Sequence, residues 1–207
     1  YRDQRRPDDA EPLYREVVAA KRAVLGNTHP DVLAAIRNLA MALDKQGKMR
    51  EARPLFVEAL AGRRRALGDL HPDTLNMISR LASAHLELGE LAEAEARATE
   101  AVAGMSKALG PRHTDTLDAI VLMARLRQKE GRFDGAARLF VGALEGSREA
   151  LGEEHLHTLL ITHNMALLSQ ARGDLGEAEY RFRGTLSALR AVAGGREATT
   201  PRQLSQL

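Results

Sequence analysis

The heptapeptide LGNTHPD at residues 25–31 returns three times along the chain, as LGDLHPD at 67–73, LGPRHTD at 109–115 and LGEEHLH at 151–157. Each copy begins 42 residues after the one before, and the histidine keeps its place in all four. Other columns keep the same spacing: Leu33, Leu75, Leu117 and Leu159; Ala40, Ala82, Ala124 and Ala166; Gly47, Gly89, Gly131 and Gly173; Ala52, Ala94, Ala136 and Ala178. A fixed period of this length indicates a repeat architecture whose units all meet one packing constraint.

Each repeat divides into two helices at its glycines. In the first repeat, residues 30–46 carry apolar side chains at the spacing of one helical face. Gly47 is expected to end this helix, because glycine adopts the left-handed conformation without a Cβ clash. A second helix is predicted at 49–67 and closed by Gly68. Small residues allow the two helices to approach closely, and they are Ala40, Ala52 and Ala59.

The composition excludes several classes of function. The 207 residues are 44% apolar and 28% charged, and no apolar run approaches the ~20 residues of a membrane span. Cysteine is absent, which excludes disulfides, thiol catalysis and cysteine-ligated metals. The net charge is 30 − 28 = +2, which gives no strong attraction to nucleic acid or membranes. Of the 30 cations, 25 are arginines, which are suited to bidentate recognition of carboxylates.

The order of the recurring residues resembles a known repeat. Leu39-Ala40, Leu43, Gly47, Ala52, Phe56 and Ala59 follow the spacing of the tetratricopeptide repeat. The 42-residue length and the Leu-Gly-x-x-His-Pro-Asp connector are similar to the kinesin light chain type of that repeat. The resemblance covers residues 11–193 and implies an all-α fold, a right-handed superhelical solenoid of antiparallel helix pairs.

The repeat period also predicts the boundaries along the chain. We expect a frayed segment at 1–10, an orphan second helix at 11–25, full repeats at 30–67, 72–109, 114–151 and 156–193, and a tail or truncated next repeat at 194–207. Because the chain starts at Tyr1 rather than at methionine, we expect it to be a fragment. An apolar stripe on the orphan helix predicts at least one further first helix before it.

The four repeat histidines are an obvious candidate metal site, but the spacing argues against one. Metal ligands lie ~2.1 Å from one point, whereas equivalent positions in stacked hairpins lie on the order of 10 Å apart. We interpret each histidine as a packing residue of the connector, with Pro30 and Pro72 at the first helical position. The fourth repeat has Leu156 and His157 in place of proline and aspartate, so its helix start is predicted to be the weakest.

Enzymatic signatures are absent from the sequence. It contains no Gly-x-Gly-x-x-Gly, no Walker sequence, no His-Glu-x-x-His and no Gly-x-Ser-x-Gly. The basic run at 63–65 is interpreted as a solvated helix face, because nucleic-acid binding requires a continuous basic stripe with stacking aromatics. We therefore predict no catalytic residue, no cofactor, no metal site and no nucleic-acid partner.

The inner wall formed by the first helices is the candidate binding surface. In tetratricopeptide arrays these helices line a concave groove, so the resemblance implies contacts at the positions beside the packed Leu-Ala pair. The expected groove positions are Arg37, Asn38, Met41, Lys45, Asn76, Ser79, Arg80, Ser83, Val121, Leu122, Arg125, His163, Asn164 and Leu167, with Asp118 beside them. Asparagine amides hold a peptide backbone, and arginine forks select carboxylates.

Kinesin light chain repeats grip cargo peptides with paired asparagines, and Asn38 and Asn164 match the second of each pair. Arg80 and Leu122 depart from that pattern, so the family's cargo preference does not transfer. The alternative for each position is an ordinary hydrophilic wall.

These observations predict a non-enzymatic adaptor or scaffold that binds a peptide segment of a partner protein. Arg37, Arg80 and Arg125 favour acidic ligands or a C-terminal carboxylate. The resemblance implies a cytoplasmic setting and a kinesin motor complex as partner, although the heptad segment that attaches such a chain to its motor is missing here. The alternative is a self-associating sensor or regulatory domain of a larger signalling or nucleotide-binding protein, joined through its uncovered end helices.

Overall fold

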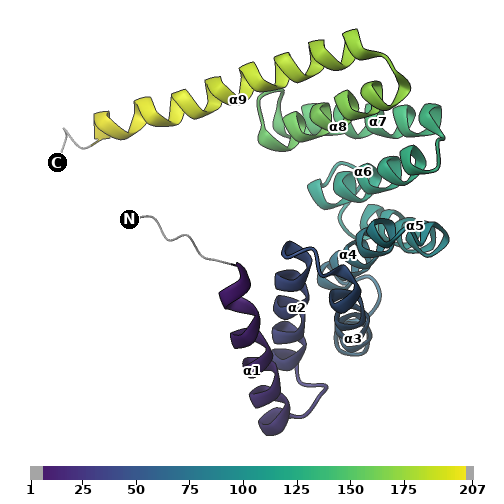
Figure 1. Ribbon diagram of the computed structural model, residues 1–207, viewed down its shortest axis with the longest axis vertical. Helices are drawn as coiled ribbons and strands as arrows, with labels where there is room; N and C mark the ends of the chain where they lie inside the picture. The colour runs from purple at the N-terminus through teal and green to yellow at the C-terminus, as the bar shows by residue number, and fades with distance from the viewer. Residues whose placement is uncertain (1–6, 204–207) are drawn as a thin grey trace. The chain divides into compact units, whose positions relative to one another are not determined.

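The computed structural model describes residues 7–203, with side chains described for residues 11–192. In that part of the chain the secondary structure is entirely α-helical (Figure 1). The helices are α1 (Pro7–Leu25), α2 (Pro30–Lys45), α3 (Met49–Leu67), α4 (Pro72–Leu88), α5 (Leu91–Ala108), α6 (Thr114–Lys129), α7 (Phe133–Leu151), α8 (Leu156–Arg172) and α9 (Leu175–Gln203). The predicted all-α repeat fold is therefore confirmed.

The helices form two compact units, the first at Tyr1–Gly110 with α1 to α5 and the second at Pro111–Leu207 with α6 to α9. Inside each unit every helix packs on the next one along the chain. First and second helices therefore alternate, and each repeat buries its apolar face against its neighbours rather than in one central core.

The four repeat histidines cap the first helices. Nδ1 of His29 and of His71 each accepts a hydrogen bond from the backbone N–H two residues later, at 3.1 Å. His113 and His155 do the same at 3.2 Å. The imidazole thus satisfies one of the N–H groups that a helix start leaves unpaired, as an asparagine or aspartate cap does. The sequence interpretation of these residues as packing groups missed this role.

Removing one of these caps tests its contribution. We expect His71→Ala to lower the free energy of unfolding by about 0.5–2 kcal/mol, the usual cost of losing an N-cap acceptor. His71→Asn should recover most of that loss, because its side-chain oxygen reaches the same N–H. Urea denaturation of the three proteins gives the comparison, and equal stability of the alanine and asparagine variants would contradict the capping role.

Small residues bring the two helices of a repeat together. Ala40, Ala52 and Ala59 are fully buried, and Phe56 packs among them. The second helix also presents a bare backbone at Gly62, where a Cβ would lie closer than 3.0 Å to the side chain of Leu33. The same clash recurs between Gly104 and Leu75 and between Gly146 and Leu117. A glycine in this column therefore sets the closest approach of the helix pair.

The Gly62 contact yields an unusual prediction for a helical glycine. Gly62→Ala should destabilise the protein by about 1–3 kcal/mol, because Leu33 is buried and the added methyl overpacks the site. Gly142→Ala is the matched control, since a Cβ at Gly142 meets nothing within 4 Å. That control should stabilise the protein by up to ~1 kcal/mol through helix propensity alone. Thermal denaturation distinguishes the two, and a stabilising Gly62→Ala would refute the close approach.

The helix ends differ from the predicted boundaries at both termini. Helix α1 begins at Pro7 rather than at residue 11, and proline suits the first helical position because its φ is already helical. Helix α9 continues past the predicted end at 193 as far as Gln203. The sequence there lacks the Leu-Gly-x-x-His connector that stops the other second helices. Residues 1–6 of the segment predicted at 1–10, and residues 204–207 of the tail predicted at 194–207, lie outside the described residues.

Candidate functional site

The predicted inner wall of the first unit lies on α2 and α4. Ile36, Leu39 and Leu43 of α2 point into the core, so the positions between them are left at the surface. Asn38, Lys45 and Arg80 are exposed, while the remaining predicted residues of this unit are half-buried: Arg37, Met41, Asn76, Ser79 and Ser83. Helices α2 and α4 both pack on α3 and, in the described part of the chain, do not approach each other at the backbone.

Polar groups on this wall are only partly engaged with the protein itself. Nη2 of Arg37 donates to Oδ1 of Asn38 at 3.3 Å, while Nε of Arg37 is buried without a hydrogen-bond partner. Among the residues that the structure describes, Lys45 and Arg80 form no ion pair. The wall therefore carries cationic donors and an asparagine amide that a ligand can use.

The second unit places its predicted residues differently. Leu122 is only 7% exposed, so it is buried rather than presented on a wall, and Val121 packs against the core cluster around Phe140. Helices α6 and α8 also approach each other directly, unlike α2 and α4. Arg125 and Leu167 remain exposed. The equivalent column carries Asn38 and Arg80 in the first unit, so the apolar Leu122 removes that contact position here.

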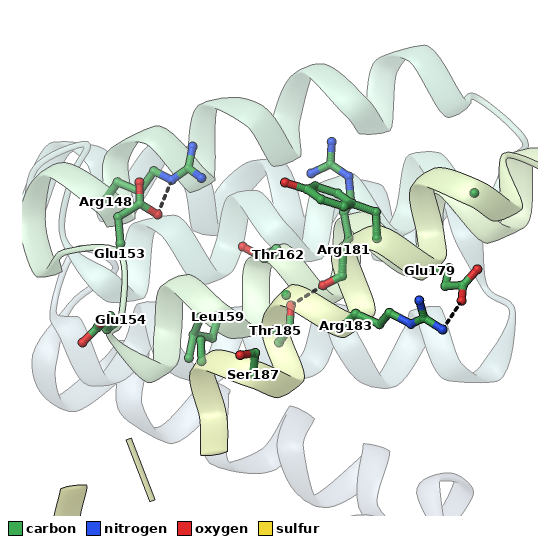
Figure 2. Close-up of a pocket in the computed structure, with 14 residues that line it drawn as sticks. Arg148, Glu153, Glu154, Leu159, Thr162, Glu179, Arg181, Arg183, Thr185 and Ser187 are labelled. Carbon is green, nitrogen blue, oxygen red and sulfur yellow. Dashed lines mark hydrogen bonds and ion pairs between the residues drawn. The ribbon is translucent and has the colours of Figure 1, made fainter. Parts of the chain in front are cut away.

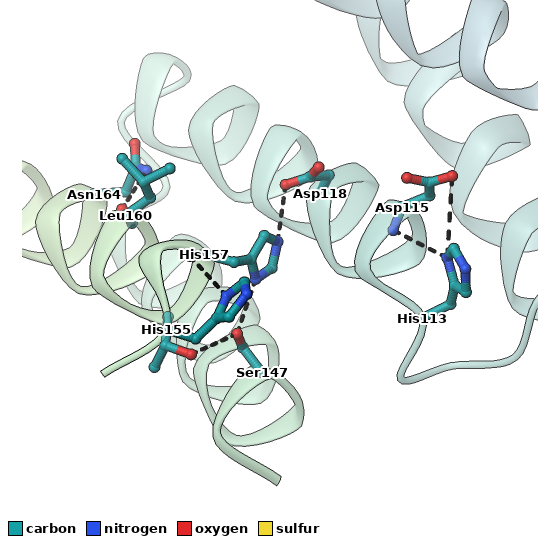
Figure 3. Close-up of polar contacts among 9 residues, drawn as sticks. His113, Asp115, Asp118, Ser147, His155, His157, Leu160 and Asn164 are labelled. Atoms are coloured by element: carbon teal, nitrogen blue, oxygen red, sulfur yellow. Dashed lines mark hydrogen bonds and ion pairs between the residues drawn. The ribbon is translucent and has the colours of Figure 1, made fainter. Parts of the chain in front are cut away.

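The polar residues of α8 are already engaged. Nδ2 of Asn164 donates to the carbonyl oxygen of Leu160 one turn earlier, at 2.8 Å (Figure 3). The ring of His163 lies 5.2 Å from the ring of Phe182 on α9, at a tilt of 58°. One donor of Asn164 is therefore already used within α8, and Leu122 and Val121 bring no polar group to the predicted wall of the second unit.

A hydrogen-bonded chain of Asp118, His157 and Ser147 joins α6, α8 and α7 (Figure 3). Nε2 of His157 lies 3.1 Å from Oδ1 of Asp118, and Nδ1 lies 2.8 Å from Oγ of Ser147. Ser147 Oγ is also 2.8 Å from Oγ1 of Thr158, which donates to the carbonyl oxygen of Gly152 at 2.7 Å. The residue types are those of a serine hydrolase triad.

The hydrogen-bond donors and acceptors in this chain run in the opposite direction to those of a hydrolase triad. Thr158 uses its single proton on the Gly152 carbonyl, so the Ser147 hydroxyl must donate to Thr158. Ser147 is then left to accept from Nδ1 of His157, while Nε2 of the same ring contacts the Asp118 carboxylate. His157 thus ties α8 to both α7 and α6. Since the fully buried Ser147 donates away from His157, this imidazole is not placed to activate it as a nucleophile.

A second set of charged contacts joins the second helices of the first unit. Arg22 of α1 contacts both carboxylate oxygens of Glu58 on α3 at 2.6 Å. Arg64 of α3 contacts Glu100 on α5 in the same way, 42 residues later. We call each arginine with the glutamate 36 residues after it a rung. The basic run at 63–65 thus contributes a rung at Arg64, while Arg63 pairs with Asp73 at 3.2 Å, so only Arg65 fits the predicted solvated face.

Two glutamates at the helix turns have altered acidity. The pKa of Glu90 is lowered from its ordinary value of 4.5, first by its hydrogen bond with His85 and then by that with Arg53. The two contacts measure 2.6 Å and 2.5 Å. The pKa of Glu11 is lowered in the same way by Lys48 and then by Arg15. Each carboxylate ties the start or turn of one repeat to a cation of another.

The lowered pKa of Glu90 predicts a pH-dependent stability. Because the folded protein favours the ionised carboxylate, its contribution is present above the unfolded pKa and is lost as the pH falls through the lower folded pKa. Glu90→Gln should therefore be less stable than the parent at pH 7, and the difference should shrink towards pH 3. Glu145→Gln, an exposed change on α7, is the control. A Glu90→Gln deficit that stays constant between those pH values would contradict the assignment.

The described residues were considered for a metal-binding cluster and for a membrane-spanning helix. No three of their histidine, aspartate and glutamate side chains gather in a way that would hold a metal ion. None of the described helices has the length and apolar character needed to cross a bilayer.

Comparisons with known proteins agree with this architecture. The family description "Tetratricopeptide repeat" matches residues 1–65, 45–107, 73–140 and 115–191. Two structures of a kinesin light chain-like protein from Podosopora anserina, described by its nearly identical TPR-like repeats, are 27% identical over 90% of this chain and 88% of theirs, with TM-scores of 0.74 and 0.71. BtubC (BKLC) from P. vanneervenii shares the fold at 20% identity, over 91% of this chain and 75% of its own, with a TM-score of 0.73. No curated protein matches the chain.

Proposed function

The chain belongs to the tetratricopeptide repeat family, and from that premise we propose that it is a non-enzymatic adaptor whose first unit binds an acidic peptide segment of a partner protein along α2 and α4. Repeats of this family serve as protein interaction scaffolds, and its structural neighbours are kinesin light chain-like proteins. The placement of the peptide on the inner wall is supported by the chemistry of the side chains there.

The observation that carries the proposal is the set of cationic groups on the first unit's inner wall. Lys45 and Arg80 are exposed and form no ion pair within the described residues, and the guanidinium of Arg37 reaches only the neutral Asn38. A carboxylate of a ligand would supply the charge-assisted hydrogen bonds that these cations lack. The Asn38 amide offers a donor to a peptide carbonyl without regard to the ligand's sequence.

The second unit is proposed to contribute less to this surface. Leu122 is buried, Asn164 is engaged with Leu160, and Asp118 is occupied by His157. Arg125 and Leu167 remain as exposed contacts. By resemblance, a kinesin motor complex as partner and a cytoplasmic setting remain part of the proposal.

A second candidate function is self-association. The end helices present apolar side chains to solvent, among them Leu13 and Val24 of α1 and Leu175 and Tyr180 of α9. Such faces favour burial against another surface. A concentration-dependent rise in mass by light scattering would favour this candidate, whereas a constant monomer mass would favour the peptide adaptor.

Peptide titration tests the adaptor directly. The probe is a fluorescent peptide Gly-Glu-Leu-Glu-Asp-Leu-Glu-Gly, with its glutamine and asparagine counterpart as the uncharged control. Binding of the acidic peptide should be saturable and should weaken with added salt, because exposed charge pairs are screened. Asn38→Ala and Arg80→Ala should each weaken the affinity by about fivefold, as expected for ~1 kcal/mol.

Arg65→Ala provides the matched control for the loss of one positive charge. Arg65 is an exposed cation on α3, a second helix, so its removal should leave the affinity nearly unchanged. Indifference of binding to salt, to Asn38→Ala and to Arg80→Ala would count against the proposed wall. So would an equal loss of affinity in Arg65→Ala.

A further inference from the structure

One rung of the second-helix series is incomplete in the second unit. Arg148 on α7 occupies the column of Arg22 and Arg64, but the residue 36 positions later is Gly184 rather than a glutamate. The contact of Arg64 with a carboxylate five residues later is kept at Arg148. Nε of Arg64 lies 2.9 Å from Asp69, and Nε of Arg148 lies 2.9 Å from Glu153, the residue five positions later in each case.

Arg148 therefore contacts a carboxylate five residues later, as Arg64 does, but it has no glutamate 36 residues later. In Arg64 the remaining edge of the guanidinium contacts Glu100 through Nη2. No carboxylate of the described residues other than Glu153 contacts Arg148. A guanidinium presents five N–H donors in a planar fork, so the Nη edge of Arg148 is available to a second carboxylate.

A cavity of about 740 Å³ lies at this incomplete rung. Figure 2 shows Arg148 with Glu153 at one end of it, the Arg183–Glu179 pair at the other, and Leu159 and Thr185 between them. Gly184 lines the cavity and brings no side chain to it. The place that Glu58 and Glu100 fill in the first two repeats is thus empty space in the fourth.

A second break in the repeat period faces the same cavity. Ala188, which lines the cavity with Leu159, stands in the column of Gly62, Gly104 and Gly146. In the first three repeats a Cβ in that column would lie closer than 3.0 Å to the paired leucine. In the fourth repeat the methyl of Ala188 stands where the earlier repeats have a bare backbone. Gly184 and Ala188 both line the cavity.

We propose that this cavity binds a single glutamate side chain of a partner peptide, which Arg148 takes as Arg64 takes Glu100. The apolar side chains of Leu159 and Ala188 in the lining suit an aliphatic residue next to that glutamate. Glu153, Glu154 and Glu179 line the cavity together with Arg148, Arg181 and Arg183, so its charges balance, and Arg181 and Arg183 are already paired with Glu177 and Glu179. A balanced lining with one incompletely paired arginine suits a ligand with one carboxylate, in contrast to the polyacidic ligand proposed for the first unit.

The position of the site makes it accessible and independent of the first unit's wall. The arginines of the complete rungs, Arg22 and Arg64, keep 37% and 32% of their side-chain surface exposed although second helices flank them. Arg148 is 44% exposed. All residues of the cavity lie on α7, on α9, at the start of α8 or in the loop before it, whereas the proposed adaptor surface lies on α2 and α4. A failure of the cavity to bind a glutamate therefore does not contradict the adaptor proposal, and a failure of the adaptor surface does not contradict the cavity proposal.

Amide NMR of the whole chain with a short peptide tests the proposal. The probe is acetylated and amidated Gly-Ser-Glu-Leu-Ser-Gly, whose only carboxylate is the glutamate, and the comparison is the same peptide with glutamine. The glutamate peptide should shift the resonances of Gly184, Ala188 and the Arg148 Nε–H, and should bind at least about tenfold more tightly than the glutamine peptide, as expected when a charged hydrogen bond is lost. Equal binding of the two peptides would overturn the proposal.

Variants of the rung itself give the decisive comparison. Gly184→Glu restores the glutamate that the first two repeats carry, so it should abolish the peptide shifts and raise the melting temperature. Gly142→Glu is the matched control, because Gly142 is the exposed glycine of the same column on α7. It should preserve peptide binding. Arg148→Gln should remove binding without altering the helical content, since Arg148 lies at the surface. Peptide shifts that persist in Gly184→Glu or in Arg148→Gln would overturn the proposal.

Discussion

The side chain of Leu33 lies against the bare backbone at Gly62, and this contact limits how closely the two helices of a repeat pack. The same pairing recurs at Leu75 and Leu117 with their glycines, so one distance is imposed on three successive hairpins. Each hairpin then buries Ala40, Phe56 or their equivalents against its neighbours. Since this packing uses one face of each first helix, the remaining positions are free to carry polar groups of different kinds.

Polar side chains follow the repeat period in the first unit and depart from it in the last repeat. Arg63 on a second helix pairs with Asp73 on the next first helix, whereas the equivalent residues are Ser147 and His157. The partner of the carboxylate now lies on a first helix, at His157. It contacts Asp118 on the preceding first helix rather than a residue at position 147. A substitution at one column therefore changes which helices are held together by charge.

The sequence predicted the helix pairs well because they follow from local rules. The helix predicted at 30–46 is observed at Pro30–Lys45, and that predicted at 49–67 is observed at Met49–Leu67. The cap made by the repeat histidines was within reach of the sequence, since the residue stands directly before a helix start. It was missed because histidine is not among the usual capping residues, and only its Nδ1 position shows the bond.

Other features depend on how helices rotate against one another, which a single sequence does not specify. The rungs join residues 36 apart, six fewer than the repeat length, and the repeat period alone does not predict this offset. Leu122 is buried on α6, which approaches α8 directly, whereas α2 and α4 stay apart in the described part of the chain. The apolar character of Leu122 and Val121 was visible beforehand and is the signal that this stretch packs rather than binds.

The free energy of exchanging hydrogen bonds explains why the two units are unequal as ligand surfaces. On α8 one N–H of Asn164 is already engaged with Leu160, and on α6 the Asp118 carboxylate already contacts His157, so fewer polar groups there are left for a ligand. On α2 and α4 the cations Lys45 and Arg80 have no carboxylate to exchange, and a ligand's contacts there are added rather than substituted. The same reasoning applies to Arg148, whose second edge lacks the glutamate that Arg64 has. Within this fold, a binding surface is thus expected where the repeat leaves a cation without its period-related carboxylate, and not simply where polar residues are dense.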